Sequence, residues 1–272
     1  MTPIKDARDA RVRFEQVTRR FPSQNRKKPG DETIAVQDIN FSIYRGELVS
    51  IIGPSGCGKS TLLGLASGLD QPSEGRVFVD GVKVEKPNSH VAFMLQKDLL
   101  LPWRSIRENV ELGQEIQGVP AAERSARAVE LLKQYRLGDF IDHYPHQLSG
   151  GMRQRAALAR TMALDPGILL MDEPFSALDA MTKMVLQKDL ALTLHAAQKT
   201  ALLITHDLVE AVILSDRVLV MSKRPGTLIK ELVIDIPHRE RPFERREHPA
   251  VAQYVKQLIE LLHIEDDEML PV

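Results

Sequence analysis

The fold is decided by the stretch Gly53-Pro54-Ser55-Gly56-Cys57-Gly58-Lys59-Ser60, which fits the phosphate-loop pattern G-x-x-x-x-G-K-[ST] at every fixed position. Residues 47–52 form a short apolar run that is typical of a buried parallel strand, and residues 60–66 can open a helix. A strand, a glycine-rich turn and a helix in this order are what a phosphate loop requires. The sequence therefore predicts a nucleotide-binding α/β domain; a glycine-rich turn that happens to precede a helix is the alternative.

The residue types of this loop suit a polyphosphate. Gly56 and Gly58 let the backbone come close, so that successive N–H groups and the helix N-terminus receive the negative charge. Lys59 would place a positive charge over the β- and γ-phosphates, and the Ser60 hydroxyl would be a ligand of Mg²⁺. We expect the other loop positions and the next residue to line the same site: Gly53, Pro54, Ser55, Cys57 and Thr61.

The composition limits the classes of protein to which this chain can belong. The chain has 272 residues, of which 43% are hydrophobic, enough for one large domain or two modest ones. A formal net charge of -1 lacks the basic excess that nucleic-acid partners leave, so DNA or RNA as the main partner is disfavoured. The first residues contain no apolar signal segment, and no run approaches the roughly 18 apolar residues that span a bilayer. With Cys57 as the single cysteine, we expect a cytoplasmic protein in a reducing compartment.

Apolar patterning predicts two kinds of sheet. Residues 12–17 and 34–43 alternate like strands with one wet face, and Asp80-Gly81 is a strong two-residue hairpin signal between two further strands. These segments predict an antiparallel β subdomain. Continuous apolar runs instead indicate strands of a mainly parallel, buried sheet. Such runs occupy residues 91–95, 168–172, 200–204 and 217–221, and residues 228–234 form one more strand.

The chain turns helical from Ser105 to about Leu137, where Pro120 is placed to start a helix. This change predicts a helical subdomain, at about residues 97–165, inserted into a domain of residues 10–236. Residues 237–272 are expected to form a C-terminal extension with an amphipathic helix. We interpret its apolar stripe as a face that packs on the domain; a dimer or regulatory contact is the alternative.

Asp172 and Glu173 close the apolar run that begins at Ile168. Ligands gather at the carboxyl ends of parallel strands, so both side chains are expected at the phosphate-loop end of the sheet. The pattern predicts that Asp172 holds Mg²⁺ through its waters and that Glu173 is the general base for the attacking water. A solvated strand end is the alternative.

Three more polar positions are candidates for the site. Gln96 follows the strand predicted at residues 91–95. His206 follows the strand predicted at residues 200–204, and this position at a strand end raises the chance that it reaches a γ-phosphate, although a lone histidine is more often structural. Ser149-Gly150-Gly151 precedes good helix formers and predicts a second helix N-terminus that could bind an anion. Alone, this last segment would be a flexible turn with an ordinary helix cap.

Together and in this order, the segments resemble the ATP-binding cassette, the nucleotide-hydrolysing subunit of ABC transporters, over about residues 12–235. The matches are the phosphate loop with Walker A, Gln96 with the Q-loop, residues 148–152 with the signature, residues 168–173 with Walker B, residues 176–179 with the D-loop and His206 with the switch histidine. The resemblance implies a P-loop NTPase core with a mainly parallel sheet, an antiparallel β subdomain and an inserted helical subdomain.

The resemblance also implies a mechanism in a head-to-tail homodimer. ATP on Walker A of one chain would meet Ser149, Gly150 and Gly151 of the other, with Asp179 of the D-loop nearby. Lys59, Glu173 and His206 would be catalytic, the last holding the γ-phosphate. The Mg²⁺ ligands would be Ser60, Gln96 and Asp172.

Two positions depart from the family pattern. Met152 stands where a glutamine often follows the signature glycines, and because Ser149 and the glycines are intact we expect activity to survive. The adenine-stacking position is commonly tyrosine, and its best match is Phe21, for which packing is the rival role.

Residues 96–103 and 222–226 resemble the nitrate/sulfonate/taurine import branch. In that branch the region after the Q-loop touches the membrane subunit, which makes Leu101 and Trp103 candidate docking residues; a core role for Trp103 is the alternative. The resemblance implies an integral membrane permease, a separate solute-binding protein and a peripheral place on the cytoplasmic face of the inner membrane. The competing functions are a soluble cassette ATPase not coupled to transport and a nucleotide-binding module without turnover.

Overall fold

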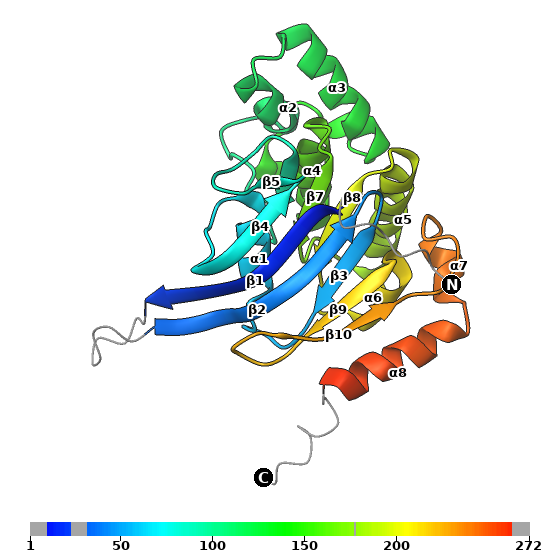
Figure 1. Cartoon of the computed structure of the whole chain (residues 1–272). Helices are drawn as coiled ribbons and strands as arrows, with labels where there is room; N and C mark the ends of the chain where they lie inside the picture. Colours follow the sequence, from blue (N-terminus) through cyan, green and yellow to red (C-terminus); the bar gives the residue numbers. More distant parts are fainter. Residues whose placement is uncertain (1–9, 23–31, 177, 263–272) are drawn as a thin grey trace, which may run out of the picture.

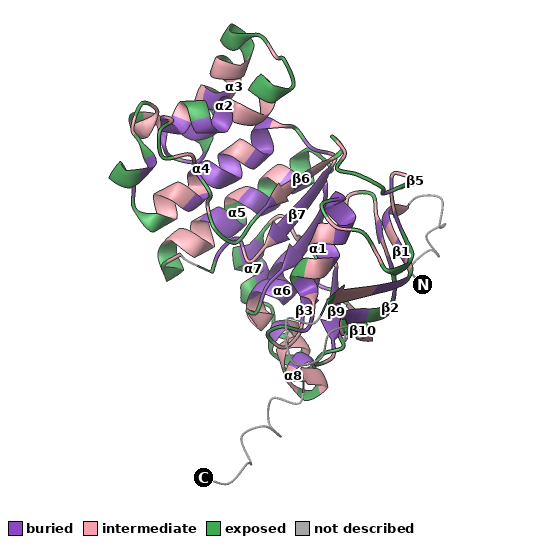
Figure 2. Cartoon of the chain, turned by 90° about the vertical axis from the view of Figure 1, so that its left-hand side faces the viewer, coloured by how far each residue is buried: buried purple, intermediate pink, exposed green. Residues whose placement is uncertain are grey.

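Two sheets and the helices around them make up the computed structural model, which describes residues 10–22, 32–176 and 178–262 (Figure 1). Ala177, within the segment matched to the D-loop, and residues 263–272 of the C-terminal extension lie outside the described residues. In the view of Figure 2, one side of the larger sheet is covered by helices α2 (Ile106–Ile116), α3 (Ala121–Gln134), α4 (Gly150–Ala163) and α5 (Ala180–Ala196). Helix α1 (Lys59–Ser67) and the smaller sheet lie on the other side.

The larger sheet has the strand order β10-β9-β3-β8-β7-β6. Its strands are β3 (Leu48–Ile52), β6 (Val91–Met94), β7 (Ile168–Asp172), β8 (Thr200–Ile204), β9 (Arg217–Met221) and β10 (Leu228–Val233). Neighbouring strands are parallel except β10, which runs antiparallel to β9. Every residue of β3, β8 and β9 is buried, as expected where both faces of a parallel sheet are covered. The mainly parallel core is therefore confirmed.

The smaller sheet is antiparallel, as the alternating pattern predicts. Its order is β2-β1-β4-β5, from β1 (Ala10–Pro22), β2 (Glu32–Tyr44), β4 (Glu74–Val79) and β5 (Val82–Lys83). Asp80 and Gly81 form the two-residue turn, with φ of 50° and 76°, which fits the turn type that this dipeptide favours.

Two hydrophobic clusters lie on opposite faces of the larger sheet. Successive strand residues point to opposite faces, so along β7 Leu169 and Met171 join the cluster beneath α2 to α5. Ile168 and Leu170 join the cluster formed with the smaller sheet and α1 (Lys59–Ser67). The smaller sheet is thereby fixed against the helix that follows the phosphate loop.

The helices between β6 and β7 form a layer at one end of the molecule (Figure 1). Its members are α2 (Ile106–Ile116), α3 (Ala121–Gln134), the short 3₁₀ helices η2 (Gly138–Phe140) and η3 (Pro145–Gln147), and α4 (Gly150–Ala163). Ser105 caps α2 by accepting from the Glu108 N–H at 3.2 Å while the Glu108 carboxylate accepts from the Ser105 N–H at 2.7 Å. This reciprocal cap fixes where the layer begins.

After β7 the chain forms α5 (Ala180–Ala196), α6 (Leu208–Leu214), α7 (Pro242–Arg246) and α8 (Ala250–Leu262). Helix α8 buries Val251 and Leu258 in the core, which is the packing that its apolar stripe predicts. None of the helices in the described ranges combines the length and the apolar character that a bilayer crossing needs.

A buried arginine anchors the C-terminal extension. Arg245 of α7 is 2% exposed and donates to the carbonyl oxygens of Ile213 at 3.0 Å, Ser215 at 3.0 Å and Ile236 at 2.6 Å. Burial lowers the pKa of Arg245 to about 10, which leaves the side chain charged at neutral pH. Since two of these carbonyls close the end of α6, the extension supports the helix that follows His206.

Replacing Arg245 with alanine is expected to lower the free energy of unfolding by about 3 kcal/mol, because buried carbonyl groups would lose their donor. Urea denaturation followed by circular dichroism measures this change. The exposed neighbour Arg246 provides the matched control, and Arg246→Ala should change stability by less than about 0.5 kcal/mol. Equal effects of the two variants would contradict the anchoring role.

Candidate functional site

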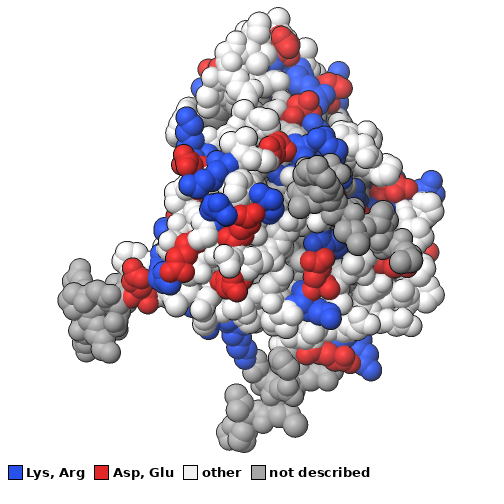
Figure 3. Space-filling model, in the orientation of Figure 1, with Lys and Arg blue, Asp and Glu red and all other residues white. Residues whose placement is uncertain are grey.

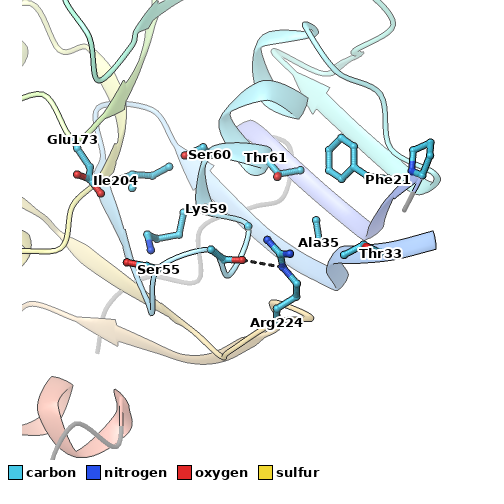
Figure 4. A pocket seen from close by; sticks show the side chains of 13 residues that line it. Phe21, Thr33, Ala35, Ser55, Lys59, Ser60, Thr61, Glu173, Ile204 and Arg224 are labelled. Atoms are coloured by element: carbon cyan, nitrogen blue, oxygen red, sulfur yellow. Dashed lines mark hydrogen bonds between the residues drawn. The ribbon is translucent and has the colours of Figure 1, made fainter. Parts of the chain in front are cut away.

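A cavity of about 540 Å³ lies beside the phosphate loop (Figure 4). Its size is within the range of sites for nucleotide-sized ligands. The wall combines residues of both sheets with the phosphate loop and the loop after β9. The lining residues are Phe21, Pro22, Thr33, Ala35, Ser55, Gly56, Gly58, Lys59, Ser60, Thr61, Glu173, Ile204 and Arg224.

Lys59 supplies a fixed positive charge inside the loop. Its side chain is buried, and Nζ donates to the carbonyl oxygens of Gly53 at 2.7 Å and Pro54 at 2.9 Å. In the described part of the chain, no carboxylate lies within 4 Å of this ammonium. The charge is therefore available to an anion in the cavity.

The N-terminus of α1 adds backbone donors. Gly58 precedes the helix with φ 103°, a conformation that other residues rarely adopt. No side chain caps this end of α1, and its first turn contains no acidic residue. The free N–H groups and the positive end of the helix dipole thus face the loop, which is the arrangement that binds phosphate.

The residues around Asp172 fit a divalent cation. Burial raises the pKa of Asp172, and the charge of Glu173 raises it further, whereas a hydrogen bond with Ser60 and the charge of Lys59 lower it. Two carboxylates beside a hydroxyl repel each other less when a cation lies between them. The described residues hold no cluster of three or more His, Cys, Asp or Glu side chains suited to a metal.

Glu173 is the point where three predicted site residues meet. Its Oε2 accepts from Gln96 Nε2 at 3.2 Å and lies 3.2 Å from His206 Nδ1. The backbone of Glu173 has φ 46°, rare outside glycine, and its N–H donates to the Ile204 carbonyl at 3.0 Å. Such a backbone conformation is unfavourable and persists where surrounding contacts hold it, which occurs most often at functional sites. Nothing in the sequence indicates this conformation.

The residues matched to the signature and the D-loop lie outside the cavity. Ser149 caps α4 by accepting from the Met152 N–H at 3.3 Å, and Asp179 caps α5 by accepting from the Thr182 N–H at 3.0 Å. Neither these residues nor Gly150 and Gly151 line the cavity of their own chain. The second helix N-terminus is therefore present, as predicted, but at a separate place on the surface.

Hydrogen bonds that sequence analysis does not detect connect α4 to the site. Gln154 Nε2 donates to the carbonyl of Pro174, next to Glu173, at 2.9 Å. Arg153 pairs with Asp98, just after Gln96, at 3.0 Å, and Arg160 donates to the Asp98 carbonyl at 2.6 Å. The helix that follows Ser149 is thus bonded to the segment that carries Glu173 and to the segment that carries Gln96.

Phe21 lines the cavity, as its predicted adenine contact requires. The guanidinium carbon of Arg19 lies 4.4 Å from the ring centroid, so one face of the ring is covered. Trp103 is 71% exposed, so the alternative of a core role is wrong.

Arg224 is a cavity residue that the sequence analysis does not identify. In the sequence, residues 222–226 stand out only by their resemblance to the import branch. The sequence does not indicate which residues an arginine in a loop contacts. In the structure Arg224 Nε donates to the Gly56 carbonyl at 3.0 Å (Figure 4).

Comparisons with known proteins agree with this geometry. A sequence model described as ABC transporter matches residues 36–176. The chain is 42% identical to the nitrate import ATP-binding protein NrtD of Synechocystis over 86% of this chain and 90% of that one. It is 44% identical to the taurine import ATP-binding protein TauB of Pseudomonas putida over 78% and 80% of the two chains. A structure described as a dimeric, post-hydrolysis state of the ATP-binding cassette MJ0796 bound to ADP and Pi matches with a TM-score of 0.74 and 33% identity, covering 83% of this chain and 99% of that one.

The raised pKa of Asp172 makes the stability of the fold depend on pH. The folded protein binds the proton of this carboxyl more tightly than the unfolded chain, so stability falls as pH rises through the folded-state pKa, and the full cost is present above that pKa. Asp172→Asn should therefore raise the thermal midpoint at pH 7.5, and the gain should shrink as the pH is lowered. Differential scanning calorimetry without nucleotide measures both effects.

Asp179→Asn is the control, because hydrogen bonds with Thr182 lower the pKa of Asp179. This variant should leave the midpoint unchanged or lower it. A stabilised Asp179→Asn protein, or an unchanged Asp172→Asn protein, would contradict the electrostatic account of the site.

Proposed function

The chain belongs to the ABC transporter family, and from this premise we propose that it is the ATP-hydrolysing subunit of an ABC importer. It couples ATP binding and hydrolysis in a cassette dimer to solute uptake through a separate permease. The observation that carries the proposal is the convergence of a fixed cation, a free helix N-terminus and the Glu173 carboxylate around one cavity.

Residues in the cavity and beside it contact different parts of the nucleotide. Lys59 and the N-terminus of α1 hold the phosphates, and Phe21 stacks on the adenine. Ser60, Asp172 and Gln96 would hold Mg²⁺, which offsets the charge of the phosphate oxygens when it is bound.

Glu173 acts as the general base of hydrolysis. Its carboxylate accepts a proton from the water that attacks the γ-phosphate, while Gln96 and His206 hold the carboxylate in place. The exposed His206 ring also extends to the γ-phosphate and stabilises the charge that develops there. Lys59, in the phosphate loop, stabilises the same negative charge on the γ-phosphate.

A second copy of the chain completes the site. Ser149 and Gly150 are exposed at the N-terminus of α4, away from their own cavity. In a head-to-tail dimer they and Gly151 approach the γ-phosphate bound by the partner, where their N–H groups and the helix dipole attract it, and Asp179 lies beside it. Hydrolysis removes this contact and reopens the dimer.

The remaining partners are membrane and solute components. The permease docks on the region after Gln96, where Trp103 is exposed and Leu101 is half-buried, and the chain sits peripherally on the cytoplasmic face of the cell membrane. Relatives named for nitrate and taurine import support a similar small solute, delivered by a separate solute-binding protein. Nucleic acid is not a partner, and on the face that Figure 3 shows, cationic and anionic side chains are interspersed.

Affinity purification tests this function. The tagged chain is isolated from detergent-solubilised membranes of its source organism, copurifying proteins are identified by mass spectrometry, and ATP turnover is measured on the eluate. A copurifying multi-span permease is expected. An eluate that hydrolyses ATP but contains only soluble proteins, ribosomes or nucleic acid would support the soluble ATPase instead.

Glu173→Gln should keep ATP affinity within a factor of about 2 and lower kcat by at least about a hundredfold, because glutamine keeps the shape but cannot accept the proton. Steady-state phosphate release and equilibrium binding of ATP measure the two effects. Unchanged turnover would refute the general-base role.

Lys59→Ala should raise the Kd for MgATP at least about tenfold, because a buried charge-assisted contact to phosphate is lost. Isothermal titration calorimetry measures the affinity. Lys188→Ala removes an exposed lysine of α5 and serves as the control, with an unchanged Kd. Equal affinities of the Lys59→Ala and wild-type proteins would exclude this loop as the phosphate site.

A further inference from the structure

Arg224 presents an unpaired positive charge to the nucleotide cavity. It lies in the loop between β9 and β10, and Figure 4 shows its side chain between the phosphate loop and the wall formed by Thr33 and Ala35, with Phe21 beyond. Among the residues that the structure describes, no carboxylate lies within 4 Å of its guanidinium. In the part of the chain that the structure describes, the hydrogen bond of this guanidinium is the one from Nε to the Gly56 carbonyl at 3.0 Å.

The guanidinium lies beside the phosphate loop. A Cβ atom at Gly56 would lie 3.7 Å from Arg224 Nη2, an ordinary van der Waals distance, so this terminal nitrogen is a neighbour of the glycine. With Nε bonded to the loop, Nη1 and Nη2 retain donors for another acceptor. In the view of Figure 4, these terminal nitrogens lie between the Phe21 ring, which is proposed to stack on the base, and the ammonium of Lys59.

The loop that carries Arg224 is held rigidly. The Ser222 hydroxyl lies 3.0 Å from Thr227 Oγ1 and donates to the Lys223 carbonyl at 2.9 Å. The Gly226 N–H donates to the Ala35 carbonyl at 3.0 Å, and a side chain at Gly226 would collide with the carbonyl oxygen of Cys57. The backbone on both sides of Arg224 is thus held between β2 and the phosphate loop, so the guanidinium is presented to the cavity from a defined position.

We propose that Arg224 is a further phosphate-binding residue of the nucleotide site, with its guanidinium contacting the α- or β-phosphate of ATP. This inference rests on the proposed function as an ATPase. A guanidinium offers parallel N–H donors that match phosphate oxygens, and a nucleotide spanning from Phe21 to Lys59 passes the terminal nitrogens of Arg224. The competing role is a solvated side chain that only steadies the Gly56 carbonyl.

Binding of MgADP and of adenosine to the full chain tests the contact. Arg224→Ala should raise the Kd for MgADP about tenfold to a hundredfold, the range for losing a charge-assisted hydrogen bond to phosphate. Its affinity for adenosine, followed by ligand-detected NMR, should stay unchanged because adenosine carries no phosphate. Arg246→Ala, which removes an exposed arginine of α7, should leave both affinities unchanged.

Two further substitutions at Arg224 distinguish a contact with phosphate from support of the Gly56 carbonyl. Lysine keeps the charge, whereas glutamine keeps a neutral donor that can still bond the Gly56 carbonyl. Arg224→Lys should therefore retain most of the MgADP affinity, and Arg224→Gln should lose as much as Arg224→Ala. The reverse order would overturn the proposal and leave only the supporting role.

The outcomes distinguish this inference from the function on which it rests. Wild-type protein that binds no MgADP would contradict the proposed function itself. Wild-type protein that binds MgADP, together with an Arg224→Ala protein of equal affinity, would overturn the phosphate contact alone. An equal loss of adenosine and MgADP binding in Arg224→Ala would also overturn it, because the charge would then not act through the phosphates.

Discussion

The attraction between a polyphosphate and the N-terminus of α1 is the interaction on which the rest of the site depends. Gly58 allows the turn, the uncapped helix leaves its N–H groups free, and Lys59 adds a full charge beneath them. Parallel strands bring the carboxylates of Asp172 and Glu173 to the same edge of the sheet. Cation, dipole and anion are thereby assembled around one cavity, and such an arrangement limits the reorganisation that catalysis has to include.

The second constraint is that the N-terminus of α1 lines the nucleotide cavity whereas the N-terminus of α4 lies outside it. The segment at Ser149 belongs to the helical layer, yet Gln154 and Arg153 bond its helix to the residues beside Glu173 and Gln96. A displacement of the helical layer by a membrane partner would therefore reach the carboxylate of Glu173, the proposed general base, through short, directional contacts. This connection gives a physical route from transport to hydrolysis in the proposed importer.

The sequence predicts much of the fold because its signals are local. The phosphate loop, the Asp80-Gly81 hairpin and the apolar strands at β7, β8 and β9 depend on neighbouring residues, and the structure has each of them. Contacts between distant segments are not readable in this way. The backbone of Glu173, the position of Arg224 over Gly56 and the buried Arg245 depend on tertiary packing, which no periodicity encodes.

Sedimentation of the Glu173→Gln protein with and without MgATP tests the shared site most sharply. One chain of 30.5 kDa is expected without nucleotide, and twice that mass with it. Adding Ser149→Arg should abolish the dimer while ATP still binds, because Ser149 lies outside the cavity of its own chain and is proposed to meet the nucleotide of the partner. A protein that binds ATP and stays monomeric, or a dimer that is indifferent to Ser149→Arg, would contradict the shared site.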